Sequence, residues 1–112
     1  MGGGESAPSN ALKDQGDFQL DLRLPQPNPS RGLSVASWSI PRAKEGARFE
    51  LALYDIAGRR VATLAEGIAK AGRFDQEVSF RSDQGVAQRN GVYFVRLRVG
   101  SQVMRRTVVL AR

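Results

Sequence analysis

The side chains that could do chemistry in this chain are mainly those of arginine, aspartate, glutamate and serine, because its 112 residues include neither cysteine nor histidine. Without cysteine there is no disulfide, no thiolate nucleophile and no sulfur ligand for a metal. Without histidine the chain lacks the most common general base at neutral pH and the most common zinc ligand. Carboxylate pairs and serine–lysine pairs remain open. The composition therefore disfavours an enzyme, and we expect no catalytic residues and no cofactor.

Acidic side chains are the remaining candidates for a metal site. Ca²⁺ takes about six to eight oxygen ligands, and loops that bind it bring Asp, Asn and Gly close together in sequence. The chain has no such dense segment. An Asp side chain often accepts hydrogen bonds from its own turn, so we interpret Asp55 and Asp83 as turn caps. We expect no bound metal at any of the acidic candidates, which are Asp55, Glu66, Asp75, Glu77 and Asp83.

The formal net charge is +6, and most of the positive charge comes from arginine. Arg96 and Arg98 share one face of a predicted strand, and a following hairpin would place Arg105 or Arg106 opposite them. This stripe could contact phosphates or an anionic glycan. It could equally be a solvated outer face on which arginine stems cover apolar surface. Only one aromatic residue, Phe94, lies on that side of the strand, so we do not expect nucleic acid binding.

Trp38 and Tyr93 are the large aromatic residues that we expect to anchor the core. A tryptophan on a middle strand is typically a core residue in β-sandwiches. Ser37 and Ser39 flank Trp38, so a sugar contact is the alternative interpretation. A carbohydrate-binding module would then use Trp38 together with Phe94.

These residues must be positioned by strands, because apolar side chains alternate with polar ones over most of the chain. Residues 1–16 are rich in small and polar side chains and predict a flexible leader or linker. Residues 17–112 predict one β-sandwich domain, since the strands are short, regularly spaced and separated by turn sequences. The seven predicted strands cover residues 18–24, 33–40, 47–54, 59–64, 74–80, 92–99 and 102–110.

Several connections carry clear turn sequences. Three prolines at alternate positions, beginning at Pro25, remove backbone donors and end the first strand. Asp55 to Gly58 predicts a short hairpin, and Gly100-Ser101 predicts a two-residue hairpin of type II′. Residues 65–72 predict a connection rather than a helix. Within the second strand the apolar parity shifts between Val35 and Ala36, which predicts either a bulge or two usable faces.

The two ends of the sequence give little functional information by themselves. The N-terminus lacks the basic and apolar regions of a secretory signal. The glycine run after Met1 is typical of an artificial leader, and we expect the chain to be one module of a longer protein. No apolar stretch approaches the length needed to cross a bilayer, so we expect no membrane span.

Five short motifs resemble one family. They are Leu24-Pro25-Gln26-Pro27-Asn28-Pro29, Leu53-Tyr54-Asp55-Ile56-Ala57-Gly58-Arg59-Arg60-Val61, Ala71-Gly72, Asn90-Gly91-Val92-Tyr93-Phe94-Val95-Arg96-Leu97 and Arg106-Thr107-Val108-Val109-Leu110. Their order resembles the C-terminal sorting domain of bacterial type IX secretion substrates, a group that overlaps the immunoglobulin-like domain of flagellar hook-capping proteins. The resemblance covers residues 24–112.

The resemblance implies a seven-stranded antiparallel immunoglobulin-like sandwich behind an upstream cargo domain. It implies recognition by the type IX outer-membrane translocon and its processing machinery, at the surface of or secreted from a Gram-negative bacterium. Anionic surface polysaccharide is a further partner that it suggests. Translocon recognition would fall on Gly91, Tyr93, Phe94, Arg96, Arg98, Arg105, Arg106 and Leu110. The structural motif residues of the family correspond to Pro27, Asn28, Pro29, Tyr54, Asp55 and Gly58.

Two other functions remain open beside sorting and the carbohydrate-binding alternative. The chain could be a structural or adhesive immunoglobulin-like spacer in a surface or fibre protein. An isolated sandwich also has exposed edge strands, so self-association through those edges is expected to be possible.

Overall fold

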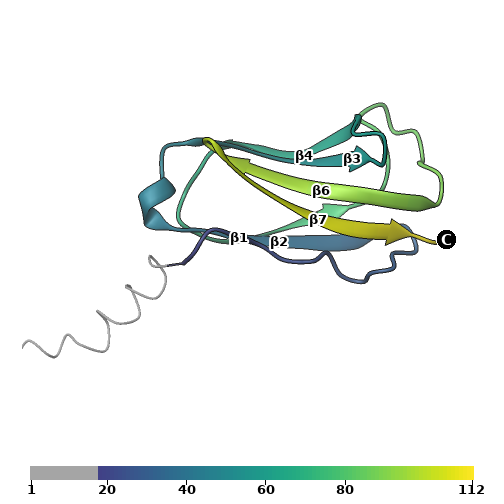
Figure 1. Ribbon diagram of the computed structural model, residues 1–112, viewed down its shortest axis with the longest axis horizontal. Helices are drawn as coiled ribbons and strands as arrows, with labels where there is room; N and C mark the ends of the chain where they lie inside the picture. The colour runs from purple at the N-terminus through teal and green to yellow at the C-terminus, as the bar shows by residue number, and fades with distance from the viewer. Residues whose placement is uncertain (1–17) are drawn as a thin grey trace, which may run out of the picture.

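Residues 18–112 are described by a computed structural model, in which two antiparallel β-sheets pack face to face (Figure 1). The predicted leader, residues 1–16, lies outside the described residues. One sheet has the order β1-β2-β5 and the other has the order β4-β3-β6-β7. The strands are β1 (Asp21–Leu22), β2 (Ser34–Ile40), β3 (Arg48–Asp55), β4 (Arg60–Ile68), β5 (Gly72–Val78), β6 (Gly91–Val99) and β7 (Gln102–Leu110). The predicted seven-stranded immunoglobulin-like sandwich is confirmed.

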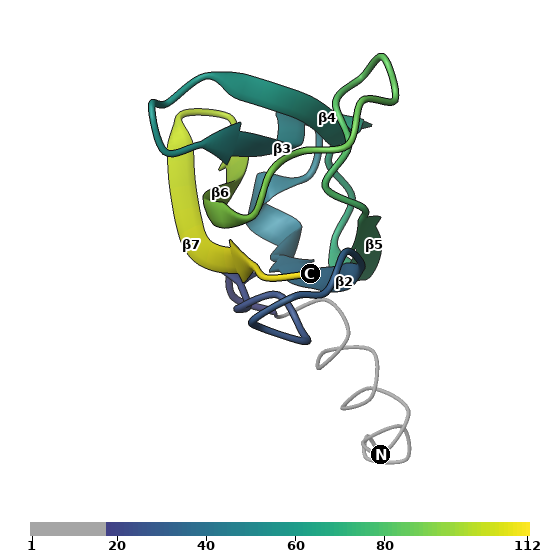
Figure 2. The ribbon, with the colours of Figure 1, turned by 90° about the vertical axis from the view of Figure 1, so that its right-hand side faces the viewer.

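The chain changes sheet three times, and these crossings hold the two layers together (Figure 2). It passes from β2 to β3 through a short 3-10 helix, Arg42–Lys44. It returns to the small sheet between β4 and β5, and it crosses again through the loop of residues 79–90. The pairing of β6 with β7 is regular over all nine residues of β7, whereas the pairing of β3 with β4 contains two register shifts.

The core lies between the sheets and is filled by the residues that the alternation predicts. On β6, Tyr93, Val95, Leu97 and Val99 are all buried. Trp38 and Tyr93 are 5% and 6% exposed, which confirms both as core aromatics. The other core side chains come from β1, β2, β3, β5, β7 and the loop after β5, and they include Leu22, Ala36, Ile40, Leu51, Leu53, Val78, Phe80, Val108 and Leu110.

The start of the sandwich differs from the prediction. The predicted first strand, residues 18–24, contracts to the two residues of β1, and Leu24 is 44% exposed. Beyond Leu22 the pairing with β2 continues only as separate contacts, at Arg23 and at a bridge between Gln26 and Val35, because prolines at 25, 27 and 29 lack a backbone donor. In β2, the parity shift does not produce a bulge, because its register with β5 is continuous. Instead Leu33 and Val35 face outward, at 53% and 39% exposed.

The middle of the chain also differs from the prediction. β4 continues to Ile68, so the expected connection over residues 65–72 is wrong for its first half. The small residues of this segment, which include Ala65 and Gly67, predict a connection. Pairing with β3 outweighs their weak local strand propensity. β5 begins at Gly72 and ends at Val78, short of the predicted Phe80. Phe80 leaves the strand with a φ of 57°, yet its side chain is completely buried.

The predicted hairpins are present. Gly58 has a φ of 85° and follows Asp55, whose Oδ1 accepts hydrogen bonds from the backbone of Ala57 and Arg59 at 3.0 and 2.9 Å. Gly100 has a φ of 59°, the left-handed value that the first central position of a type II′ turn requires. β7 begins and ends where the sequence predicted. In the part of the chain that the structure describes, no helix is long and apolar enough to cross a membrane.

Candidate functional site

The outer face of the four-stranded sheet brings most of the exposed arginines of the β6–β7 hairpin together. Strand register sets three rows of side chains across this face. The first row runs Thr107, Phe94, Tyr54, Arg60. The second runs Arg105, Arg96, Ala52, Thr63. The third runs Val103, Arg98, Glu50, Glu66. We call the surface formed by Tyr54, Phe94, Arg96, Arg98 and Arg105 the arginine–aromatic face.

Two of these arginines lie over aromatic rings. The guanidinium carbon of Arg105 is 4.6 Å from the ring centroid of Phe94, and that of Arg96 is 5.1 Å from the centroid of Tyr54. A cation over the face of an aromatic ring is attracted by the ring quadrupole, by about 0.5–1 kcal/mol at exposed sites. The contacts hold both guanidinium groups close to the sheet. In the described part of the chain neither guanidinium has an ion-pair partner, so its donors can bond to an incoming acceptor.

The charge of this face is only partly neutralised. Arg60 pairs with Glu50 at 3.2 Å, and hydrogen bonding by the Tyr54 side chain, followed by the charge of Glu50, raises the pKa of Arg60. Among residues 18–112, no carboxylate lies within ion-pair distance of Arg96, Arg98 or Arg105. The face is therefore positive toward β7 and closer to neutral toward β4.

The predicted recognition residues separate into two groups. Phe94, Arg96, Arg98 and Arg105 lie on the arginine–aromatic face. Arg105, and not Arg106, stands opposite Arg96. The remaining four are elsewhere: Gly91 opens β6, Tyr93 and Leu110 are buried in the core, and Arg106 points toward the small sheet.

Arg106 and Tyr93 have structural partners in their positions. Arg106 is half-buried, and its Nη2 is 3.8 Å from Oδ1 of Asp21. The Tyr93 hydroxyl donates to the backbone oxygen of Arg89 at 2.6 Å. Burial raises the pKa of Tyr93 above its ordinary value of 10.0. These contacts tie the hairpin to β1 and to the preceding loop.

Tyr54 is the functional residue that sequence reasoning placed differently. The sequence places it in the hairpin motif and predicts one aromatic residue, Phe94, on the outer face. The register of β3 with β6 pairs Tyr54 with Phe94 and supplies the second ring. The alternation of β3 could have shown that Tyr54 faces outward, but not that it neighbours Phe94. Ile56, at 72% exposed, extends the same end of the face into a shallow pocket of about 330 Å³.

The predicted structural motif at Pro27-Asn28-Pro29 lies beside β7. The amide side chain of Asn28 donates to the Thr107 oxygen at 3.2 Å and accepts from the Val109 nitrogen at 2.9 Å. The Ser30 nitrogen donates to the Val109 oxygen at 2.6 Å. This segment therefore acts as a short cap on the C-terminal half of the β7 edge.

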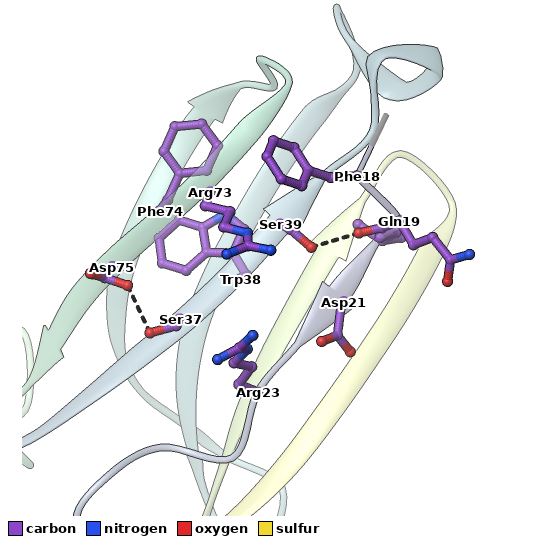
Figure 3. A pocket seen from close by; sticks show the side chains of 11 residues that line it. Phe18, Gln19, Asp21, Arg23, Ser37, Trp38, Ser39, Arg73, Phe74 and Asp75 are labelled. Atoms are coloured by element: carbon purple, nitrogen blue, oxygen red, sulfur yellow. Dashed lines mark hydrogen bonds between the residues drawn. The ribbon is translucent and has the colours of Figure 1, made fainter. Parts of the chain in front are cut away.

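A second hollow, of about 490 Å³, lies on the outer face of the small sheet (Figure 3). Its floor is formed by two serines of β2, because small side chains leave room there. Ser37 donates to Asp75 at 2.7 Å, and Ser39 donates to the backbone oxygen of Gln19 at 2.6 Å. The other polar groups that line it are Asp21, Arg23 and Arg73.

The hollow also tests the proposed sugar contact of Trp38 and Phe94. The Trp38 ring packs on Phe74, with centroids 5.7 Å apart, and its Nε1 is buried and has no hydrogen-bond partner among residues 18–112. Phe94 lies on the other sheet, on the arginine–aromatic face. The structure therefore does not bring the two predicted rings together. The aromatic ring over the polar floor is Phe18, which lies 5.0 Å from the Arg73 guanidinium.

Within residues 18–112, no cluster of three or more carboxylates is arranged to hold a metal ion. Asp55 accepts turn hydrogen bonds, as the sequence predicted. Asp83 caps a different segment, because its Oδ1 accepts from the backbone of Thr63 on β4.

By its fold the chain is an immunoglobulin-like β-sandwich module. No protein-family model matches the sequence, and no curated protein matches it. Among solved structures, it is similar to part of PorZ from Porphyromonas gingivalis, which is described as an essential bacterial surface component of the type-IX secretion system. The two are 17% identical with a TM-score of 0.46. The match covers 83% of this chain but only 11% of the length of the PorZ chain.

Proposed function

We propose that this chain is a non-enzymatic sorting and anchoring module that directs an upstream cargo protein through the type IX secretion system to the cell surface. The observation that carries the proposal is the arginine–aromatic face, on which the β6–β7 hairpin presents guanidinium groups that have no carboxylate partner among the described residues. The five sequence motifs support it, since they supply this hairpin, the Asp55 turn and the cap beside β7. The partners would be the outer-membrane translocon and its processing machinery.

The test is a fusion of the 112-residue chain to the C-terminus of a periplasmic reporter in a bacterium with a type IX system. We expect the reporter to reach the cell surface or the medium. Reversing the charge of Arg96, Arg98 and Arg105 to Glu should hold it in the periplasm. Reversing Arg31, Arg42 and Lys44 is the matched control with the same change of net charge, and it should leave export intact. Retention of the unaltered fusion in the periplasm would refute the proposal.

Surface substitutions are needed because truncation cannot separate sorting from a spacer role. Removing β7 would also remove Val108 and Leu110, which are buried in the core. The triple charge reversal leaves those residues in place. If the chain is a structural or adhesive spacer instead, the unaltered fusion is not exported in a manner that depends on the type IX system.

A carbohydrate-binding function is the second candidate, and the hollow of the small sheet is the observation that favours it. Hydroxyl, carboxylate and guanidinium groups together provide donors and acceptors for sugar hydroxyls. The residues that would carry this function are Arg23 and Arg73, rather than Trp38 and Phe94. Glycan-array binding that disappears in Arg73→Ala, with the fold unchanged, would support this candidate over sorting.

A further inference from the structure

The outer edge of β7 is capped over only half of its length. β7 is the last strand of the four-stranded sheet, so among residues 18–112 no strand pairs with the outer side of its backbone, although β1 of the small sheet lies nearby. Asn28 and Ser30 occupy the Thr107 oxygen and the nitrogen and oxygen of Val109. The half of β7 that begins at Gln102 has no such cap.

Strand geometry identifies the backbone groups that remain open. In a β-strand the backbone groups of alternate residues point to the same side. The backbone N–H and C=O of Val109 point away from β6. Because the β6–β7 register is unbroken, the backbone groups of Val103, Arg105 and Thr107 also point away from β6. Among residues 18–112, no backbone group bonds to Val103 or Arg105 on this side, although the Arg105 oxygen accepts from Nη1 of its neighbour Arg106 at 3.1 Å. The Thr107 nitrogen is also without a backbone partner.

The other edge of the same sheet is protected differently. β4 has two register shifts against β3, which twist and interrupt its edge. The Asp83 side chain and backbone also bond to Thr63 and Val61 of β4. Irregularity and capping are the usual ways in which proteins prevent edge-to-edge pairing. In the described part of the chain, the uncapped half of β7 has an unbroken register, and only the Arg106 side chain bonds to its outer edge.

The charge beside this edge selects the kind of strand that could pair with it. The side chain of Arg105 lies on the outer face at the open backbone, with Arg98 and Arg96 on the neighbouring strand. None of the three has a carboxylate partner in the described part of the chain. A second copy pairing antiparallel about Arg105 would place two Arg105 side chains opposite one another. Like charges directly opposite each other destabilise a strand pair, so self-pairing is disfavoured.

We propose that the uncapped half of β7 binds an extended acidic segment of another protein by β-strand addition. This inference rests on the proposed sorting function and gives the chemistry of the partner at that site. The incoming strand bonds to the nitrogen and oxygen of Val103 and to the nitrogens of Arg105 and Thr107. Its outward side chains are acidic and face Arg105 and Arg98. Its inward side chains are apolar and lie beside the half-buried Met104, which packs against the core.

The first experiment measures binding of a capped synthetic peptide of about seven residues in which Glu and Val alternate, a length suited to one short strand. We expect the 112-residue chain to bind it, with the amides of Val103, Arg105 and Thr107 becoming protected from hydrogen exchange. Affinity should fall as NaCl rises from about 50 to about 300 mM, because exposed charge pairs are screened. Absence of binding, or equal binding of the peptide with Lys in place of Glu, overturns the proposal.

Backbone substitutions separate strand addition from simple attraction between charges. Val103→Pro and Thr107→Pro each remove one outward N–H while leaving the bonds to β6 in place, as proline is tolerated on edge strands. We expect the dissociation constant to rise by about tenfold in each, since each loses a backbone hydrogen bond of about 1.4 kcal/mol. Val103→Thr and Thr107→Val change the same side chains, keep the N–H and should bind normally.

A modified peptide makes the test independent of the stability of any variant. N-methylation of the peptide at alternate residues removes the N–H donors of its pairing edge and places methyl groups between the two strands. It should therefore abolish binding to the unaltered chain. If the Pro variants and the methylated peptide both bind as well as the originals, the contact is through side chains alone, and strand addition is wrong.

The outcomes for sorting and for strand addition are distinguishable. If the Val103→Pro and Thr107→Pro fusions are exported normally, the sorting function holds and strand addition is refuted. If the unaltered fusion stays in the periplasm while the acidic peptide still binds through the β7 backbone, the sorting function is refuted and the edge retains its specificity for an acidic strand.

Discussion

At the scale of single residues, Asp55 shows how one side chain fixes the turn between two strands. Its Oδ1 accepts from two backbone nitrogens, and its Oδ2 is 3.0 Å from Nε of Arg59. The backbone hydrogen bond from Arg59 is the largest effect that lowers the pKa of Asp55 below its ordinary value of 3.8. Hydrogen bonds to the ionised carboxylate and the adjacent positive charge stabilise the charged form.

This shift predicts a pH dependence of stability. Because the pKa is lower in the folded state, Asp55 stabilises the fold above pH 3.8, and that contribution is lost as pH falls through the folded pKa. Asp55→Asn keeps an acceptor but loses the charge. In urea unfolding, the unaltered chain should be more stable than the variant at pH 7, and the difference should shrink below pH 3.8. A difference that stays constant from neutral to strongly acidic pH would contradict this role.

At the scale of elements, the Asn28 side chain makes hydrogen bonds to the outer edge of β7 of the kind that a neighbouring strand would make. Its side-chain amide carries N–H donors and a carbonyl acceptor, as the backbone of a strand residue does, and one N–H and the oxygen bond to β7. The flanking prolines provide no N–H of their own, so the side chain and Ser30 supply the contacts. The segment thereby holds the last strand against the side of the small sheet.

Asn28→Ala should therefore loosen the end of β7. It leaves the Thr107 oxygen and the Val109 nitrogen without this partner, so we expect a loss of about 1–3 kcal/mol in the free energy of unfolding. Hydrogen exchange at Val109 should accelerate as well. Asn90→Ala is the matched control, because Asn90 accepts a single exposed bond from Arg112. Equal urea midpoints for Asn28→Ala and Asn90→Ala would show that the cap does not stabilise β7.

At the scale of the whole molecule, Phe80 joins the two layers. It lies just after β5 of the small sheet, and its ring meets Tyr93 of the large sheet edge to face, with centroids 5.6 Å apart. The residue is fully buried and has a positive φ, which is rare for a bulky side chain. Burial of the ring between the sheets offsets the cost of that backbone conformation.

Phe80→Ala should consequently be among the most damaging single substitutions. Removal of a fully buried phenylalanine leaves a cavity and costs about 3–5 kcal/mol. Phe94→Ala makes the same chemical change on the outer face, where mainly a cation–π contact of about 1 kcal/mol is lost. Urea unfolding of the two variants measures the contrast. Equal destabilisation would mean that Phe80 does not join the sheets as described.

Local sequence patterns predicted much of this fold. The bounds of β7 were predicted correctly, and so were the buried side chains of β6 and the turns at Asp55 and Gly100. The errors lie where local propensity is weak. The small residues Ala65 and Gly67 of β4 predicted a connection, and alternating leucines before Pro25 predicted a full strand. Pairing with β3 extends β4 to Ile68, and the prolines after Leu24 interrupt the pairing of the first segment with β2.

The sequence alone determined that the chain alternates between a buried and an exposed side, and that Phe94, Arg96 and Arg98 share the exposed one. Both properties depend on the two-residue period of a strand, which is local. Only the tertiary structure decided that Arg105 rather than Arg106 stands opposite Arg96, and that Tyr54 completes the face. It also decided that Asn28 caps β7, across 79 and 81 residues of sequence. These contacts depend on strand register and sheet order, which arise from packing of the whole core rather than from any local segment.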